Sequence, residues 1–360
     1  MKSLYVHIPF CKQKCLYCDF NSYSGKENLI ENYVIALKKE IQSYNFNEFK
    51  TVYFGGGTPS IIPAKYIAEI MQMVKCNGEV TLELNPGTID AEKLKQYKEA
   101  GINRLSIGLQ ATQNSILQEI GRIHTLEEFD KAYKMTREAG FTNINVDLMF
   151  GLPNQTIKDV EESLNYLIEI NPEHISCYSL ILHSDIFKNL PSDDEEREMY
   201  YLIIQMLKEA GYEHYEISNF SKPEKESKHN LCYWNQEEYV GIGAGASSYI
   251  DKKRYTNELN IEKYITKINN KEQVFEIEEI QDKEQQIREY MILRLRLIEG
   301  VCIEEAHEKF GVNICEKFEE NIKNMIQKEL LEIVEENNYK FIRLTKKGMD
   351  FANIVWEEFV

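Results

Sequence analysis

Short apolar runs and longer amphipathic stretches alternate along the first half of the chain. Six of the short runs are rich in β-branched and aromatic residues, which is typical of buried strands. These predicted strands are Ser3–Ile8, Thr51–Phe54, Val80–Leu84, Arg104–Leu109, Asn143–Phe150 and His174–Leu182. Between them, apolar residues return at helical spacing, as over 27–44 and Thr156–Ile170. Such strand–helix alternation predicts a parallel sheet with right-handed crossovers, in the form of either an open sheet or a barrel.

The pattern changes after the last of these strands. An amphipathic helix is expected over Ser192–Gly211 and a short strand over His214–Ser218. From about Gln281 the chain reads as mainly helical. The elements expected there are helices Gln281–Glu299, Ile303–Phe310 and Cys315–Lys328, a hairpin over Leu330–Thr345 with its turn at Asn337-Asn338, and a last helix. Helices followed by a hairpin resemble a winged-helix unit, but its candidate recognition helix mixes acidic residues with lysines, which favours a lid or packing role over DNA binding.

The overall charge narrows the class of protein. The 360 residues carry a formal net charge of −17, with 43% hydrophobic and 28% charged residues. This composition is typical of a globular protein, and the negative charge argues against a nucleic-acid partner, which needs a basic surface. No apolar run approaches the ~20 residues that span a membrane, so we expect no stable membrane insertion. The N-terminus has no signal-peptide pattern, and we therefore expect a cytoplasmic protein.

Cysteines are crowded near the N-terminus. Cys11, Cys15 and Cys18 form a C-x3-C-x2-C motif, and because cytoplasmic thiols stay reduced, the motif favours a metal site or catalysis over disulfides. A structural zinc site would need a fourth ligand, for which His7 is the nearest candidate, or a distant cysteine. A [4Fe–4S] cluster held by three cysteines would keep one iron open for a small molecule. The scattered cysteines are expected to be buried apolar residues: Cys76, Cys177, Cys232, Cys302 and Cys315.

Polar or glycine-rich features also follow the other predicted strands. GGGTP (55–59) follows the second strand, Glu83 and Gln110 end the third and fourth, and Asp147 lies within the fifth. The carboxyl ends of parallel strands share one edge, where α/β proteins place their sites, so these features are expected to converge. Glycines allow backbone groups to approach a ligand closely. The alternative explanation of these residues is a tight turn after which Pro59 starts a helix.

With the aromatic Tyr17 before its last cysteine, the motif resembles that of the radical S-adenosylmethionine (SAM) superfamily. The resemblance implies that the open iron takes the amino and carboxylate groups of SAM. It also implies that the reduced cluster breaks the S–C5′ bond to give a 5′-deoxyadenosyl radical, for which the protein supplies position and exclusion of water.

The resemblance narrows to the oxygen-independent coproporphyrinogen oxidase-like family. It is carried, in family order, by YVHIPFCKQKCLYCDF, YFGGGTPS, LELNP, GINRLSIGLQ, GRIHT, NVDLMFGLPNQT and HNLCYWN. It implies an α/β fold: a partial (β/α)6 TIM-like barrel of the radical SAM type (1–250), a connector (251–280) and a smaller, mainly helical, winged-helix-like C-terminal domain (281–360). The cluster ligands that it implies are Cys11, Cys15 and Cys18. The SAM contacts that it implies are Tyr5, Tyr17, Gly56, Gly57, Thr58, Glu83, Gln110, Arg122 and Asp147.

Three features separate this chain from the oxidases themselves. The motif of the oxidases resembles C-x3-C-x2-C-x-C, with a fourth cysteine two residues after the third. In this chain Phe20 stands at that position. The oxidases carry a long N-terminal extension, whereas the first predicted strand here starts at Ser3. HNLCYWN matches the H-N-x-x-Y-W signature of the heme chaperone (HemW) branch. We therefore favour a heme chaperone over the alternative, an oxygen-independent coproporphyrinogen III oxidase that decarboxylates its substrate to protoporphyrinogen IX, and over a heme-methylating or ring-opening enzyme.

The heme chaperone resemblance implies heme as a ligand and heme-acceptor proteins, such as membrane respiratory enzymes, as partners. His229 is a candidate iron ligand, and Tyr233 and Trp234 could flank the porphyrin. The alternative is that His229 and Asn230 cap a loop while the two aromatic residues belong to the core. The other candidate axial histidines are His7, His124, His174, His183, His214 and His307.

Overall fold

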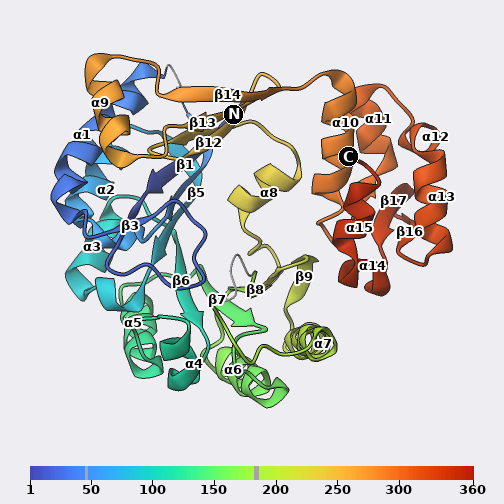
Figure 1. The fold of residues 1–360 in the computed structure, drawn as a ribbon, viewed down its shortest axis with the longest axis horizontal. Coiled ribbons are helices and arrows are strands. Elements are labelled where there is room, and N and C mark those ends of the chain that lie inside the picture. Colours follow the sequence, from blue (N-terminus) through green and yellow to red (C-terminus); the bar gives the residue numbers. More distant parts are fainter. Residues whose placement is uncertain (45–47, 182–185) are drawn as a thin grey trace.

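The computed structural model describes residues 1–44, 48–181 and 186–360, and it contains the predicted parallel sheet (Figure 1). Six parallel strands lie in the order β1-β4-β5-β6-β7-β8. Their bounds are Lys2–Ile8 (β1), Phe49–Gly56 (β4), Cys76–Leu84 (β5), Arg104–Gln110 (β6), Ile144–Phe150 (β7) and His174–Ser179 (β8). Each contains or overlaps one predicted strand. The end of the sixth prediction, Leu182, lies outside the described residues.

Helices between these strands, and one after β8, cover the outer face of a curved sheet (Figure 1). They are α1 (Ile30–Ser43), α2 (Ala64–Met71), α3 (Ala91–Glu99), α4 (Asn114–Glu119), α5 (Leu126–Glu138), α6 (Ile157–Ile170) and α7 (Asp193–Glu209), with short 3₁₀ turns η1 (Glu27–Leu29), η2 (Pro59–Ile61) and η3 (Pro86–Thr88). Side-chain alternation fixes the two faces of the sheet. In β1, Leu4, Val6 and Ile8 join the core under the helices, whereas Tyr5 and His7 face the concave side.

The sheet continues beyond the parallel strands at both edges, to twelve strands among the described residues. β10 (Asn219–Ser221) and β9 (Glu213–Glu216) follow β8 in antiparallel pairing. β11 (Tyr239–Ile242) pairs parallel with β1 and leads into β12 (Ser247–Ile250), β13 (Lys253–Asn257) and β14 (Phe275–Ile280). Helix α9 (Ile261–Asn270) packs on α1. Strands β13 and β14 are therefore part of the sheet, although the sequence suggested a connector over 251–280.

A separate apolar core forms the C-terminal unit. Its elements are α10 (Lys283–Arg294), β15 (Val301–Cys302), α11 (Ile303–Phe310), α12 (Ile314–Lys317), α13 (Glu319–Gln327), β16 (Leu331–Glu336), β17 (Tyr339–Leu344), α14 (Lys346–Asp350) and α15 (Ala352–Glu357). The predicted hairpin is present, with Asn337 and Asn338 at φ 52° and 69° in its turn, the conformation that a type I′ turn requires. The helix expected over Cys315–Lys328 is broken at Phe318, whose side chain is buried in this core.

The segment that carries HNLCYWN folds as a short helix, α8 (Lys228–Trp234), on the concave side of the sheet. It contacts β4 on one side and α10 of the C-terminal unit on the other (Figure 1). Ser227 caps it, since its Oγ accepts a hydrogen bond from the backbone N–H of Asn230. In the part of the chain that is described, no helix combines the length and the apolar character needed to cross a membrane.

Candidate functional site

The cysteine motif forms a loop at the carboxyl end of the parallel strands. Cys11 ends the short strand β2 (Phe10–Cys11), which pairs with β3 (Tyr23–Ser24), and its side chain is buried, whereas Cys15 and Cys18 are partly exposed. Burial raises the pKa of the Cys11 thiol, while nearby hydroxyls oppose this effect. Among the described residues, no three His, Cys, Asp or Glu side chains are arranged to hold one metal ion together.

Each of these thiols lies near a polar group. Thr58 Oγ1 is 3.6 Å from Cys11 Sγ, and Arg122 Nη1 is 3.7 Å from Cys15 Sγ. Ser22 Oγ is 3.9 Å from Cys18 Sγ. Hydrogen bonds to thiolate sulfur stabilise the anionic form that ligates iron, so the loop fits a cluster bound through sulfur.

The glycine run packs directly against the cysteine loop. The backbone N–H groups of Gly57 and Thr58 donate to the carbonyls of Ile8 and Phe10, at 2.9 and 2.8 Å. A Cβ on Gly57 would lie only 2.9 Å from Cys11 Sγ, so no larger residue fits without moving the thiol. Gly56 has φ 118°, which L side chains rarely adopt. The turn explanation also describes the structure, because η2 starts at Pro59.

Two carboxylates lie on the concave face, Glu83 on β5 and Asp147 on β7, with β6 between these strands. The Tyr53 hydroxyl donates to Glu83 Oε1 at 2.8 Å, and Asn145 Nδ2 donates to Asp147 Oδ1 at 2.7 Å. Burial raises the pKa of Glu83 to about 7, with a smaller contribution from the negative charge of Asp147. Burial also raises the pKa of Asp147. Both carboxylates therefore face the concave side in a buried setting that favours their protonated forms.

Arg122 connects the cysteine loop to the end of β6. Its Nη2 donates to the Gly108 carbonyl at 3.1 Å, while its buried Nε has no hydrogen-bond partner. Burial raises the pKa of Tyr17, and the positive charge of Arg122 opposes this rise. Gln110 lies beside it in a left-handed conformation, φ 73°, and accepts from the Tyr178 hydroxyl at 3.0 Å. An unpartnered guanidinium N–H in a buried site suits an anionic group such as a carboxylate.

His7 is held by two hydrogen bonds on the same concave face. Its Nδ1 lies 3.0 Å from the Tyr5 hydroxyl, and its Nε2 lies 2.8 Å from the backbone carbonyl of Asn21. Use of His7 as a fourth metal ligand would require one of these bonds to break. Its contacts instead tie the segment after Cys18 to β1.

His229 lies deep between α8 and the sheet, with 1% of its surface exposed. Its Nδ1 is 2.8 Å from Thr51 Oγ1 and its Nε2 is 2.7 Å from the Tyr233 hydroxyl. Burial lowers the pKa of His229 to about 3, so the ring is neutral at physiological pH. Direct ligation of heme iron by His229 would therefore require one of these two hydrogen bonds to be replaced.

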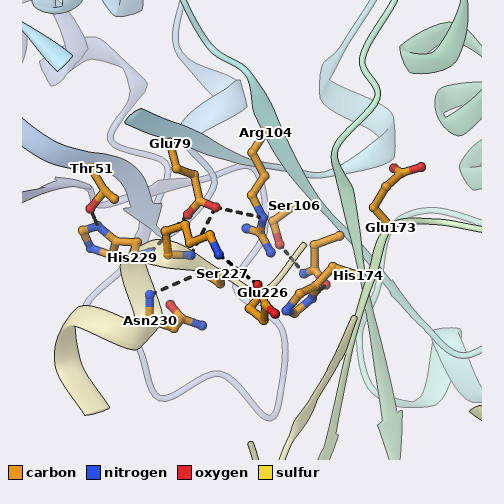
Figure 2. A network of polar contacts seen from close by, with 12 residues as sticks. Thr51, Glu79, Arg104, Ser106, Glu173, His174, Glu226, Ser227, His229 and Asn230 are labelled. Carbon is orange, nitrogen blue, oxygen red and sulfur yellow. Dashed lines mark hydrogen bonds and ion pairs between the residues drawn. The ribbon is translucent and has the colours of Figure 1, made fainter. Parts of the chain in front are cut away.

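A polar network fixes the position of α8 (Figure 2). Glu79 accepts hydrogen bonds from the backbone N–H groups of Lys228 and His229, both at 3.2 Å, at the N-terminus of the helix. Its other neighbour is Arg104, whose Nε lies 3.9 Å from Glu79 Oε2 and whose side chain is 2% exposed. The sequence analysis missed both residues, although an arginine opening a predicted strand is a signal of a polar inner face.

A cavity of about 470 Å³ lies between the cysteine loop and α8. This volume is in the range of roughly 300–1,000 Å³ that is typical of small-molecule sites. Tyr233 and Trp234 line it, together with residues that the sequence analysis did not single out for binding: Asp19, Asn21, Gln236, Tyr239, Gly245, Ser247, Tyr249, Arg254 and Leu293. Tyr5, His7 and Phe20 complete the lining. Of the residues predicted to contact SAM, Tyr5 lines this cavity, opposite Tyr233 and Trp234 of the HNLCYWN helix.

Of the other candidate histidines that the structure describes, His7 lines this cavity, whereas the remaining ones do not. His174 is held between Asn145 and the Tyr215 hydroxyl, at 2.6 and 2.8 Å. His124 and His214 bond to backbone carbonyls, and His307 is exposed on α11. His183 lies outside the described residues.

The family comparisons agree with this architecture. Residues 5–167 match the model of the Radical SAM superfamily, and residues 281–351 match the HemN C-terminal domain. A solved structure of coproporphyrinogen III oxidase (HemN) from Escherichia coli superposes with a TM-score of 0.86 and 23% identity, over 99% of this chain and 89% of that one. The fold is thus that of a radical SAM protein with a HemN-type C-terminal domain, as the sequence predicted.

Full-length relatives define the branch. The heme chaperone HemW of Lactococcus lactis is 36% identical, over 99% of this chain and 97% of its own length. The HemW of Bacillus subtilis is 38% identical, over 100% of this chain and 99% of its own length. The chain belongs to the HemW family.

Proposed function

We propose that this protein is a heme chaperone, which binds heme and passes it to acceptor proteins such as membrane respiratory enzymes. The cavity beside α8 carries the proposal, because it places Tyr233 and Trp234 of the family signature next to the cysteine loop. Aromatic rings supply the apolar faces that a porphyrin needs. The buried Nε1 of Trp234 has no hydrogen-bond partner, and a polar ligand group could fill that position.

In this proposal Cys11, Cys15 and Cys18 hold a [4Fe–4S] cluster. Tyr5, Tyr17, the Gly56–Thr58 run and Gln110 surround an exchangeable SAM, with Glu83 and Asp147 near its cationic groups and Arg122 near its carboxylate. When bound, cluster and SAM supply a route to a 5′-deoxyadenosyl radical. His229 then acts by holding the Tyr233 hydroxyl in place.

The chaperone is favoured over the oxidase by the residue after Asp19. The oxidase motif has a fourth cysteine at this position, whereas this chain has Phe20. The Phe20 side chain lines the cavity and is 68% exposed. An exposed aromatic side chain at a cavity mouth is suited to packing on a flat apolar ligand.

A split-sample experiment tests the proposal. The cluster is reconstituted without oxygen, and one half receives coproporphyrinogen III, SAM and a reductant, while the other is titrated with hemin. We expect one equivalent of hemin to bind with a Soret band and no decarboxylation. Formation of harderoporphyrinogen or protoporphyrinogen would establish the oxidase instead. The two tryptophans provide a matched pair of variants: Trp234→Phe should weaken hemin binding, whereas Trp356→Phe, in the C-terminal unit, should not.

Glu83 should make SAM binding dependent on pH. Burial raises the pKa of Glu83 to about 7, and ionised Glu83 is the form that attracts a cation. We therefore expect SAM affinity to rise as the pH increases to about 7 and to level off above it, since binding releases the proton from Glu83. Equilibrium dialysis of labelled SAM from pH 5.5 to about 8.5 measures this dependence.

Without SAM, the effect of pH on stability has the opposite sign. The folded protein keeps a proton on Glu83 between the ordinary glutamate pKa of ~4.3 and the raised value, so its stability falls as pH rises through this window. Glu83→Gln should flatten both profiles, and Glu161→Gln, an exposed position on α6, serves as the control. Identical profiles for wild type and Glu83→Gln would contradict this role.

A further inference from the structure

Four tyrosines line the cavity, and their hydroxyl oxygens are suited to ferric iron: Tyr5, Tyr233, Tyr239 and Tyr249. His7 also lines it, but both of its ring nitrogens are already hydrogen-bonded. Tyr5 and Tyr233 use their hydroxyls to bond His7 and His229. Tyr239 differs from them, because its hydroxyl oxygen accepts a hydrogen bond from Arg254 Nη1 at 3.3 Å. Burial raises the pKa of the Tyr239 hydroxyl, and the Arg254 cation opposes this rise. The phenolate, which is the form that Arg254 stabilises, is a known class of ligand to ferric heme.

The sheet places this pair on one wall of the cavity. Tyr239 of β11 lies opposite Tyr249 of β12, which lies opposite Arg254 of β13, so the three side chains share one face. The Arg254 guanidinium also packs over the Tyr249 ring, 5.0 Å from its centroid. The Tyr233 ring meets Tyr239 edge to face, with centroids 4.6 Å apart. This wall of the cavity therefore combines the apolar faces of tyrosine rings with the Tyr239 hydroxyl, which Arg254 holds by a hydrogen bond.

Arg254 is fixed from the C-terminal unit. Its Nε donates to Glu289 Oε1 of α10 at 3.0 Å, and Glu289 also accepts from Gln236 Nε2 at 3.0 Å. Leu293, one turn further along α10, lines the same cavity. The guanidinium fork thus reaches Tyr239 with one nitrogen while its other nitrogens are held, which limits its movement.

We propose that Tyr239, supported by Arg254, is the residue that coordinates the iron of ferric heme in this cavity. The inference rests on the proposed heme chaperone function. On binding, the Tyr239 hydroxyl releases its proton to solvent and the phenolate oxygen donates an electron pair to Fe(III), with no change of oxidation state. The residues of α8 then act as the apolar flank, and His229 is a positioning residue that keeps Tyr233 in place.

The test is a hemin titration of the full-length protein, combined with resonance Raman spectroscopy for iron–phenolate modes. Wild type should bind hemin and show these modes. Tyr239→Phe should lose the modes and bind hemin about tenfold more weakly or worse. Arg254→Lys keeps a positive charge beside Glu289 but lacks the guanidinium that contacts Glu289 and Tyr239 together. It should weaken hemin binding by about 10- to 100-fold, which is the usual effect of losing a residue that hydrogen-bonds to a metal ligand. Tyr255→Phe, the neighbouring position on β13, is the control for folding and should match wild type.

The outcomes separate the two proposals. Failure of the wild type to bind hemin would overturn the chaperone function and this inference with it. Hemin binding by the wild type without phenolate modes, or modes that persist in Tyr239→Phe, would overturn only the ligand assignment. Loss of the modes in Tyr249→Phe but not in Tyr239→Phe would overturn it as well, and would identify the adjacent tyrosine.

Discussion

Replacement of Cys15 by alanine should abolish the iron–sulfur cluster of this protein. After anaerobic reconstitution, wild type is expected to hold about four irons and to absorb broadly near ~400 nm, as a cysteine-ligated [4Fe–4S] centre does. With only Cys11 and Cys18 left in the loop, the variant should lose both the absorbance and most of the bound iron. Arg122 would also lose the sulfur that its Nη1 contacts at 3.7 Å, so SAM binding should fall with the cluster.

Cys315→Ala provides the matched control, because Cys315 is also a partly exposed free cysteine but lies in the C-terminal unit. Iron content and absorbance should be unchanged in that variant. Full iron content in Cys15→Ala would show that the ligand assignment is wrong. Equal losses in both variants would point to general damage from reconstitution.

The parallel sheet could be predicted because apolar side chains recur regularly along its strands. These side chains pack under the helices on the outer face. The same alternation leaves the opposite face polar, which explains why Glu83, Asp147 and Arg104 come together although they are far apart in sequence. The hairpin turn at Asn337-Asn338 was predictable for a local reason, since asparagine tolerates positive φ. Each of these features depends on short-range chemistry.

The cavity and the environment of His229 could not be predicted in this way. The cavity wall depends on β11–β13 pairing beside β1 and on Glu289 of α10 reaching Arg254, which are long-range contacts with no local signature. His229 suggested a metal ligand from its motif alone, but its two ring nitrogens bond Thr51 and Tyr233. Only the folded structure shows that a motif histidine is already engaged.

The largest effect on stability is expected from Glu79, the carboxylate that joins α8 to the sheet (Figure 2). Glu79→Ala would remove the carboxylate that lies 3.9 Å from the buried Arg104 Nε and would leave two N–H groups of α8 without their acceptor. Removing one member of a buried pair costs about 3–5 kcal/mol, so the free energy of unfolding should fall by that amount in urea titrations. Glu161→Ala, on the exposed face of α6, should change it by no more than about 0.5 kcal/mol. Hemin binding should weaken as well, because α8 carries Tyr233 and Trp234 into the cavity. If Glu79→Ala were as stable as Glu161→Ala, the network would not be what positions this helix.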